Sequence, residues 1–272
     1  MRGFQPPHKG PPPGRRGAGP RKGGNAPLEQ WIYGRHAVAA ALANPRRRWY
    51  RLVALPAQAE AARALVAAAI AVRRGDGEPV QVLERAQLAA MLPPGAVHQG
   101  LALAVEPLAP VDLDAIVQAA TGAAMLIALD RVSDPQNVGA VLRSAAAFGA
   151  AAVILTRDGA PAASGVLAKA ASGALEHVPL VRVVNLARAL DRLKAAGFWI
   201  CGLCESASEP LSAFDLGARV VLVLGSEGGG MRRLVRERCD HLARLPTHPL
   251  QPTLNVASAA AVALYELARR RC

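Results

Sequence analysis

The second half of the chain alternates short apolar runs with helix-like stretches, and no other feature restricts the fold as much. From residue 125 onward the apolar runs predict strands, and the stretches between them predict helices. Strands that are apolar throughout and separated by helices are typical of a parallel sheet covered on both faces. Such a sheet binds ligands beyond the carboxyl ends of its strands. The expected strands are residues 125–130, 152–155, 178–183, 198–203 and 220–225, and the expected helices 137–148, 164–171, 186–196 and 254–271.

A smaller α/β unit is expected before this sheet, over residues 28–105. Its expected helices are residues 35–43, 60–72 and 84–91, and its expected strands are 50–55, 80–83 and 101–105. Pro107 and Pro110 indicate a linker at residues 106–114, so the larger unit spans 115–272. The chain is therefore predicted to be an α/β protein of two domains.

The chain carries a large excess of positive charge, with a formal net charge of +12. Such an excess favours a polyanionic partner, because neutralised phosphates release counterions; a solubilising surface charge is the alternative. Residues 1–27 are rich in Gly and Pro and hold six basic residues and no acidic one, which predicts a disordered basic tail. Two interpretations of the tail stay open: non-specific attraction to RNA, and a dispensable extension.

Composition also excludes several classes of protein. Aromatic residues make up only 4% of the chain, which argues against RNA-binding folds built on aromatic stacking. No apolar run is long enough to span a bilayer and no signal peptide is recognised, so a cytoplasmic protein without a membrane partner is expected. Cys201 and Cys204 are expected on opposite faces of one strand, which suits neither a metal nor a redox pair. Reduced cysteines and no metal site are expected.

The first loop of interest follows the strand at residues 125–130. Asp134-Pro135 predicts a turn, Asn137 is expected to cap the next helix, and Arg143 follows six residues later. A free helix N-terminus with an arginine nearby can bind phosphate. Taken alone, an ordinary strand–turn–helix with a solvent-facing arginine explains this segment better.

The second loop holds four glycines within residues 225–230, together with Glu227. Glycines let a ligand approach the backbone closely and permit positive φ angles. The segment lacks the lysine of a P-loop, and the carboxylate of Glu227 disfavours a phosphate ligand but tolerates a cation such as a sulfonium. A glycine-rich turn without a ligand is the alternative.

The third loop leads into the C-terminal helix. Thr253 and Asn255 stand where that alanine-rich helix is expected to begin. They are either simple helix caps or a hydroxyl and an amide that contact a ligand or RNA.

Together, the three loops resemble the three signature motifs of the SpoU branch of the SPOUT RNA methyltransferases. The Asn-x(5)-Arg, Gly-x-Glu-Gly and Ser-Leu-Asn-Val patterns of that family match Asn137 and Arg143; Gly225, Glu227 and Gly228; and Leu254, Asn255 and Val256. Thr253 stands where the family usually has Ser, which keeps the hydroxyl but restricts its rotamers. Pro249 and Pro252 also depart from the small residues usual in that loop.

The resemblance implies a fold, a cofactor and a reaction. It implies a small N-terminal α/β substrate-binding domain, a C-terminal parallel-sheet SPOUT domain with a trefoil knot, and a homodimer. The cofactor would be S-adenosyl-L-methionine, and the reaction a methyl transfer to a ribose 2′-hydroxyl, a group that only RNA carries. The resemblance assigns catalysis to Arg143, Asn137, Glu227 and Asn255; cofactor binding to Gly225, Glu227, Gly228, Leu245, Thr253, Leu254 and Asn255; and RNA binding to Arg35, His36 and Arg143.

The side chain of Arg143 is a poor candidate for a general base. Its counterpart is the proposed base in the family, but a guanidinium normally stays protonated. An electrostatic clamp on phosphate and on the developing alkoxide is therefore the preferred role for Arg143.

Further segments narrow the expected substrate to 23S rRNA. Residues 33–38, 95–100 and 231–240 resemble parts of bacterial 23S rRNA (guanosine-2′-O)-methyltransferases, which implies a guanosine target. The alternatives are the same reaction on transfer RNA and a non-catalytic RNA-binding protein. A nucleotide-binding oxidoreductase is disfavoured by Glu227 and by the net charge. The run Arg46-Arg47-Arg48 is either an RNA contact or a solvated turn.

Overall fold

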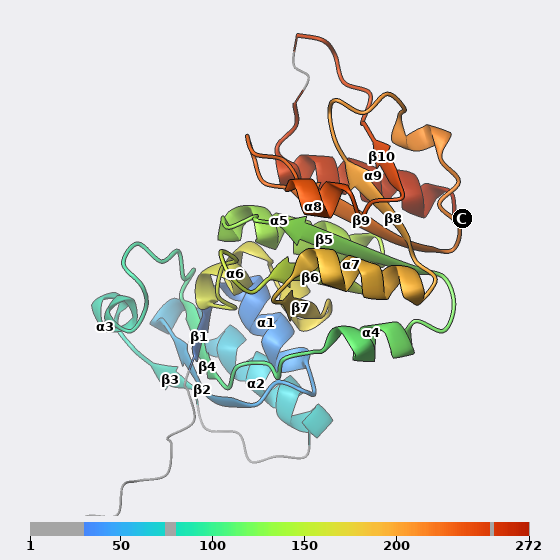
Figure 1. Cartoon of the computed structure of the whole chain (residues 1–272). Coiled ribbons are helices and arrows are strands. Elements are labelled where there is room, and N and C mark those ends of the chain that lie inside the picture. Colours follow the sequence, from blue (N-terminus) through green and yellow to red (C-terminus); the bar gives the residue numbers. More distant parts are fainter. Residues whose placement is uncertain (1–29, 74–79, 251–252, 272) are drawn as a thin grey trace, which may run out of the picture.

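A computed structural model of the chain describes residues 30–73, 80–250 and 253–271. The expected basic tail lies outside these residues. The described chain forms two packed parts, each built around its own sheet (Figure 1). The strand order is β1-β4-β2-β3 in the smaller part and β10-β8-β9-β5-β6-β7 in the larger one.

The smaller sheet is mostly antiparallel. Strand β4 lies between β1 and β2 and pairs antiparallel with both, whereas β3 pairs parallel with β2. All five residues of β4 are buried, as its central place requires. Helix α3 begins at a reciprocal capping box between Glu84 and Gln87. The elements are β1 (Gln30–Tyr33), α1 (Arg35–Ala43), β2 (Trp49–Ala54), α2 (Ala59–Arg73), β3 (Gln81–Val82), α3 (Arg85–Ala90) and β4 (Leu101–Val105).

The larger sheet is parallel at every pairing, which confirms the predicted fold class. Its central strands β5 and β9 pair along their whole length, from Ala124 beside Arg219 to Asp130 beside Gly225. The elements are α4 (Leu113–Ala119), β5 (Ala124–Asp130), α5 (Pro135–Ala147), β6 (Ala152–Thr156), α6 (Gly165–Ala170), β7 (Leu180–Val183), α7 (Leu186–Ala195), β8 (Trp199–Leu203), β9 (Arg219–Gly225), α8 (Arg233–Arg236), β10 (His241–Ala243) and α9 (Val256–Arg269). The trefoil knot stays a prediction.

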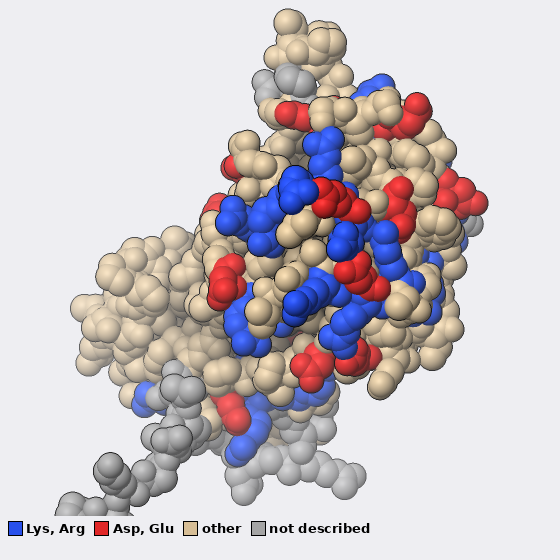
Figure 2. Space-filling model, in the orientation of Figure 1, with Lys and Arg blue, Asp and Glu red and all other residues tan. Residues whose placement is uncertain are grey.

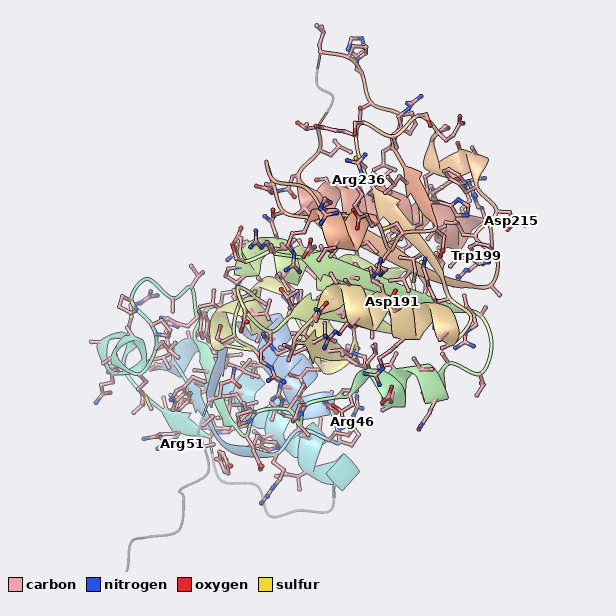
Figure 3. The ribbon with its side chains drawn as sticks, in the orientation of Figure 1. Arg46, Arg51, Asp191, Trp199, Asp215 and Arg236 are labelled. Carbon is pink, nitrogen blue, oxygen red and sulfur yellow. The ribbon has the colours of Figure 1, made fainter. Side chains whose placement is uncertain are left out.

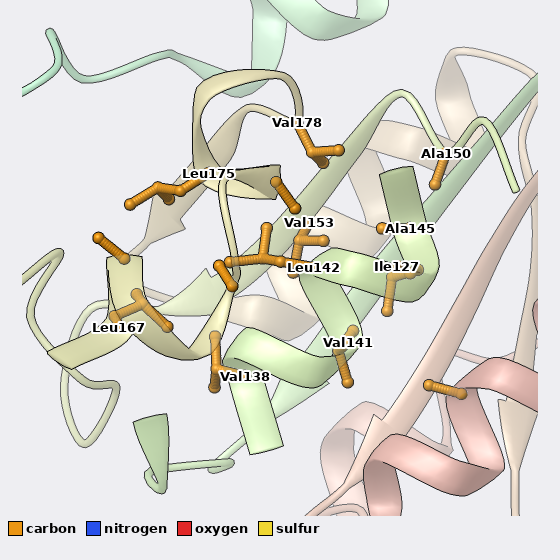
Figure 4. Packing of buried hydrophobic residues seen from close by; sticks show 14 of the residues in the cluster. Ile127, Val138, Val141, Leu142, Ala145, Ala150, Val153, Leu167, Leu175 and Val178 are labelled. Atoms are coloured by element: carbon orange, nitrogen blue, oxygen red, sulfur yellow. The ribbon is translucent and has the colours of Figure 1, made fainter. Parts of the chain in front are cut away.

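Helices cover both faces of the parallel sheet, as its continuous apolar strands predict. Alternate residues of β5 point to opposite faces, so Ile127 packs in the cluster with α5, α6 and α9. Leu126 packs in the cluster with α4, α7 and α8. Helices α5 and α6 pack against each other, and Val138 of α5 and Leu167 of α6 lie in the same cluster (Figure 4). A Cβ at Gly139 would lie 2.4 Å from the Cβ of Ala170.

A buried ion pair joins the two parts. Glu176, in a 3-10 turn (Ala174–Glu176) after α6, accepts hydrogen bonds from Arg47 Nε and Asn44 Nδ2 at 3.1 and 2.8 Å. Arg47 also donates to the backbone oxygen of Glu106, and only 3% of Arg47 and 4% of Glu176 are exposed. Arg47 therefore binds its own chain, and the interpretation of this arginine as an RNA contact is wrong.

The start of α5 differs from the prediction. The helix begins at Pro135, and the side chain of Asp134 caps it by accepting from the backbone N–H of Gln136 at 2.9 Å. Asn137 therefore lies inside the first turn and is not the cap. Strands β1 and β10 and helices α4 and α8 were not predicted, because each is short or lies in a segment interpreted as a loop.

Candidate active site

Three side chains from distant parts of the sequence meet at the carboxyl edge of the parallel sheet. Asn137 lies on the first turn of α5, Glu227 in the loop after β9, and Asn255 at the N-cap of α9. Asn137 Nδ2 donates to Glu227 Oε1 at 3.0 Å. Asn255 Nδ2 donates to the same oxygen at 2.6 Å and to Asn137 Oδ1 at 3.0 Å. The three loops of the sequence analysis thus converge in one hydrogen-bonded network.

One carboxylate oxygen of the network can still accept a hydrogen bond. Glu227 Oε1 accepts from both amides, whereas Oε2 has no hydrogen-bond partner among the described residues. Asn255 Oδ1 is used to cap α9, accepting from the backbone N–H of Ala257 at 2.9 Å. Glu227 is therefore an exposed carboxylate held in one orientation with one oxygen open to a substrate.

The glycines shape the loop that carries Glu227. Ser226 and Gly230 exchange backbone hydrogen bonds of 3.2 and 2.9 Å, which close a tight turn around the carboxylate. The φ angle of Gly228 is +74°, in the left-handed region that favours glycine. A Cβ at Gly225 would lie 2.0 Å from the carbonyl carbon of Gly230, so no larger residue fits there.

A buried carboxylate that none of the sequence motifs singled out fixes the segment that follows this loop. Asp130, at the end of β5, is fully buried and accepts from the backbone N–H and the Nε of Arg232, both at 2.8 Å. This ion pair ties the segment after the glycine turn to the end of β5 beside it. An acid that ends an otherwise apolar strand was the signal that could have found it.

The residues expected at the cofactor site fit S-adenosylmethionine chemically. Leu254 is 42% exposed next to the network, and Leu245 packs against the core with part of its surface open. The space beside Gly228 is open, which leaves the loop backbone free to contact a ligand, and Thr253 is exposed. Apolar surface, open backbone and one carboxylate together suit a ligand that is part apolar and part cationic.

Arg143 lies apart from the network. It stands six residues after Asn137 on α5, about 9 Å further along the helix axis. Its side chain is exposed and has no hydrogen bond or ion pair with the described residues. The earlier start of α5 moves Arg143 from the expected second turn to the third.

Arg35 and His36 are both exposed at the start of α1. The backbone N–H of Arg35 donates to Gln99 Oε1, and Lys169 Nζ on α6 donates to the same oxygen at 2.6 Å. Gln99 lies in the segment 95–100, so this segment holds the small domain against the catalytic part.

The cysteines are free in the described part of the chain. Burial raises the pKa of the Cys201 and Cys239 thiols to about 12. In the same residues, no group of three or more metal-binding side chains gathers, and no helix is long and apolar enough to cross a membrane. A cavity of about 320 Å³ opens near α4, at the sheet edge opposite the network, but mainly small uncharged residues line it.

Comparison with known proteins agrees with this geometry. Residues 124–265 match the SpoU rRNA Methylase family, and residues 31–111 match the RNA 2′-O ribose methyltransferase substrate binding family. A 23S rRNA (guanosine-2′-O-)-methyltransferase RlmB of Xylella fastidiosa is 41% identical over 89% of this chain and 97% of its own length. The protein of the same name from Pseudomonas aeruginosa is 39% identical over 90% of this chain and 98% of its own length.

Solved structures share the fold. The AdoMet-bound rRNA methyltransferase of Sinorhizobium meliloti superposes with a TM-score of 0.71 at 26% identity, covering 89% of this chain and 87% of its own. A structure concerned with 2′-OH methylation of C/U34 on tRNA is 30% identical with a TM-score of 0.50, but covers only 55% of this chain and 98% of its own. The resemblance drawn from the motifs is thereby confirmed: this chain belongs to the SpoU rRNA methylase family.

Proposed function

We propose that this chain transfers a methyl group from S-adenosylmethionine to the 2′-hydroxyl of a ribose in RNA, and that its target is a guanosine of 23S rRNA. The observation that carries the proposal is the Asn137–Glu227–Asn255 network at the carboxyl edge, in a chain of the SpoU family. The chain is thus an enzyme whose substrate is RNA.

The glycine loop and the residues before α9 would hold the cofactor. S-adenosylmethionine, when bound, supplies a methyl group on a positively charged sulfur. The Glu227 carboxylate would favour that charge, and the exposed face of Leu254 would contact the apolar part. The backbone around Gly225, Gly228 and Leu245 would hold the adenosyl group.

The network would position the ribose. Glu227 Oε2 can accept a hydrogen bond from the 2′-hydroxyl, and Asn137 and Asn255 hold this carboxylate in place. Fixing the attacking oxygen removes orientational freedom, an effect worth about 7–11 kcal/mol in the best cases. Arg143 would supply positive charge for the RNA phosphate and the developing alkoxide, since its guanidinium stays protonated.

Coverage of the relatives supports ribosomal RNA over transfer RNA. The curated 23S rRNA methyltransferases align with the chain over nearly their whole length, small domain included. The tRNA-related structure aligns with little more than half of it. Arg35 and His36, exposed on the small domain, are the proposed RNA contacts there. The proposed location is the cytoplasm, where such an RNA is made.

Exposed apolar side chains support a homodimer. Val262 and Tyr265 on α9 are 47% and 56% exposed, and Tyr265 meets Phe148 edge-on at 6.0 Å between ring centroids. We propose that a second copy covers this surface, which borders α5, the helix of Arg143. Sedimentation equilibrium should give twice the chain mass for the wild type, and a monomer for Tyr265→Glu.

Titration calorimetry with adenosylhomocysteine and NAD tests the proposed cofactor class. Adenosylhomocysteine should bind and NAD should not, and Arg143→Ala should keep this binding while losing methyl transfer. Binding of NAD alone would overturn the proposal and favour an oxidoreductase.

A further inference from the structure

We propose that Arg131 and Arg157 form a clamp that binds a phosphate of the RNA strand beside the catalytic network. The proposal rests on the function proposed above and adds two substrate-positioning residues to it. Neither residue belongs to the three signature motifs.

Two neighbouring parallel strands end just before the two arginines. β5 and β6 pair in parallel, with Leu129 beside Leu155, and Arg131 and Arg157 are each the first residue after these neighbouring strands. On the other side of β5, Asp130 lies beside Gly225, where the loop of Glu227 begins. The two arginines therefore lie at the same carboxyl edge as the network, and both are exposed.

The charge of these arginines is not neutralised by the described chain. Neither has a carboxylate within ion-pair distance among the described residues. Over α7 and α8, by contrast, basic and acidic side chains lie intermixed (Figure 2). Asp191 on α7, labelled in Figure 3, pairs with Arg238 at 2.9 Å. Arg192 likewise pairs with Asp114. Arg131 and Arg157 thus leave two charges without an ion pair at the edge where RNA would enter.

Two neighbouring guanidinium groups repel each other unless an anion lies between them. A phosphate satisfies both, because each guanidinium presents a planar fork of donors that matches phosphate oxygens. The target ribose must lie at the network, so a phosphate that flanks it is the anion within reach.

The backbone of Arg131 gives an independent reason to assign it a role. Its φ angle is +61°, in the left-handed region that glycine or asparagine normally fills. An arginine there carries a conformational cost, and its side chain has no hydrogen bond to the described chain that would offset it. Strain of this kind clusters at functional sites.

The variants Arg131→Gly and Arg157→Gln test the clamp. Glycine relieves the positive φ, so Arg131→Gly removes the charge without endangering the fold. Arg192→Ala is the matched control, because it removes an arginine that is already paired with Asp114 near the opposite edge. RNA affinity is measured over a range of salt concentrations, with methyl-transfer kinetics and adenosylhomocysteine binding alongside.

Each clamp variant should raise the KM for RNA about tenfold and lower the slope of log affinity against log salt by about 0.7. Arg157→Lys should restore the slope, and adenosylhomocysteine binding should not change. Wild-type slopes and KM values in both variants, with a wild-type enzyme that transfers methyl, would overturn the clamp alone. A wild type that binds RNA with the predicted slopes but never transfers methyl would overturn the proposed function and leave the clamp supported.

Discussion

The buried ion pair between Arg47 and Glu176 predicts that one small substitution destabilises the whole chain. Glu176→Ala removes the carboxylate that accepts from Arg47 and Asn44. Arg47, which is 3% exposed, then keeps the Glu106 carbonyl as its side-chain acceptor among the described residues. Removing one partner of a buried pair costs about 3–5 kcal/mol, because the other charge is left without compensation. For a protein of this size class, such a loss corresponds to a fall in Tm of roughly 6–20 °C.

Thermal unfolding of the full chain, followed by circular dichroism, measures this cost. Arg192→Ala breaks an ion pair whose side chains are 56% and 65% exposed, so it should change the free energy of unfolding by less than about 1 kcal/mol. The double variant Arg47→Met/Glu176→Leu, which removes both charges, should recover most of the stability lost in Glu176→Ala. A loss in Glu176→Ala no larger than in Arg192→Ala would refute the reasoning.

Three further predictions concern the site and the thiols. Gly225→Ala should lower adenosylhomocysteine affinity at least tenfold, because the new Cβ would lie 2.0 Å from Gly230; calorimetry measures it, and unchanged affinity would place the cofactor elsewhere. Asn255→Ser keeps a helix cap but removes the amide that donates to Glu227, so methyl transfer should fall at least a hundredfold while Tm shifts little. A large fall in Tm together with the loss of methyl transfer would indicate a merely structural role for Asn255. Iodoacetamide at pH 8 should leave Cys201 and Cys239 unlabelled in the folded chain, because burial raises their thiol pKa to about 12 and the reactive thiolate is absent far below that pH. Rapid labelling of either would contradict their burial.

The parallel sheet could be predicted from the sequence because its strands are local apolar runs. β5 and β9 were expected to within one residue at each end, since both are buried on two faces. Strand β1, by contrast, has four residues and acquires its partner β4 only some 70 positions later in the chain, so no local pattern marks it. The cap of α5 was misplaced because Asn137 was preferred over Asp134-Pro135, although proline favours the first helical position.

The members of the candidate site were predictable from motifs, but their contacts were not. Asn137 and Glu227 are 90 positions apart, and only the pairing of β5 with β9 brings their loops together. The pair of Arg47 and Glu176 spans 129 positions and two domains. From the sequence, Arg47 was interpreted as part of the basic run around it. No local pattern indicates that its partner is a carboxylate far along the chain.

The most direct test of the proposed reaction is methyl transfer from labelled S-adenosylmethionine to unmodified 23S rRNA, with transfer RNA in parallel and the RNA then digested to nucleosides. We predict label in 2′-O-methylguanosine from 23S rRNA alone, and none with Glu227→Gln, which keeps the shape of that side chain and removes its charge. Label on a base would contradict ribose methylation, and label in transfer RNA only would contradict the proposed substrate. Full activity of Glu227→Gln would contradict the proposed role of the Glu227 carboxylate.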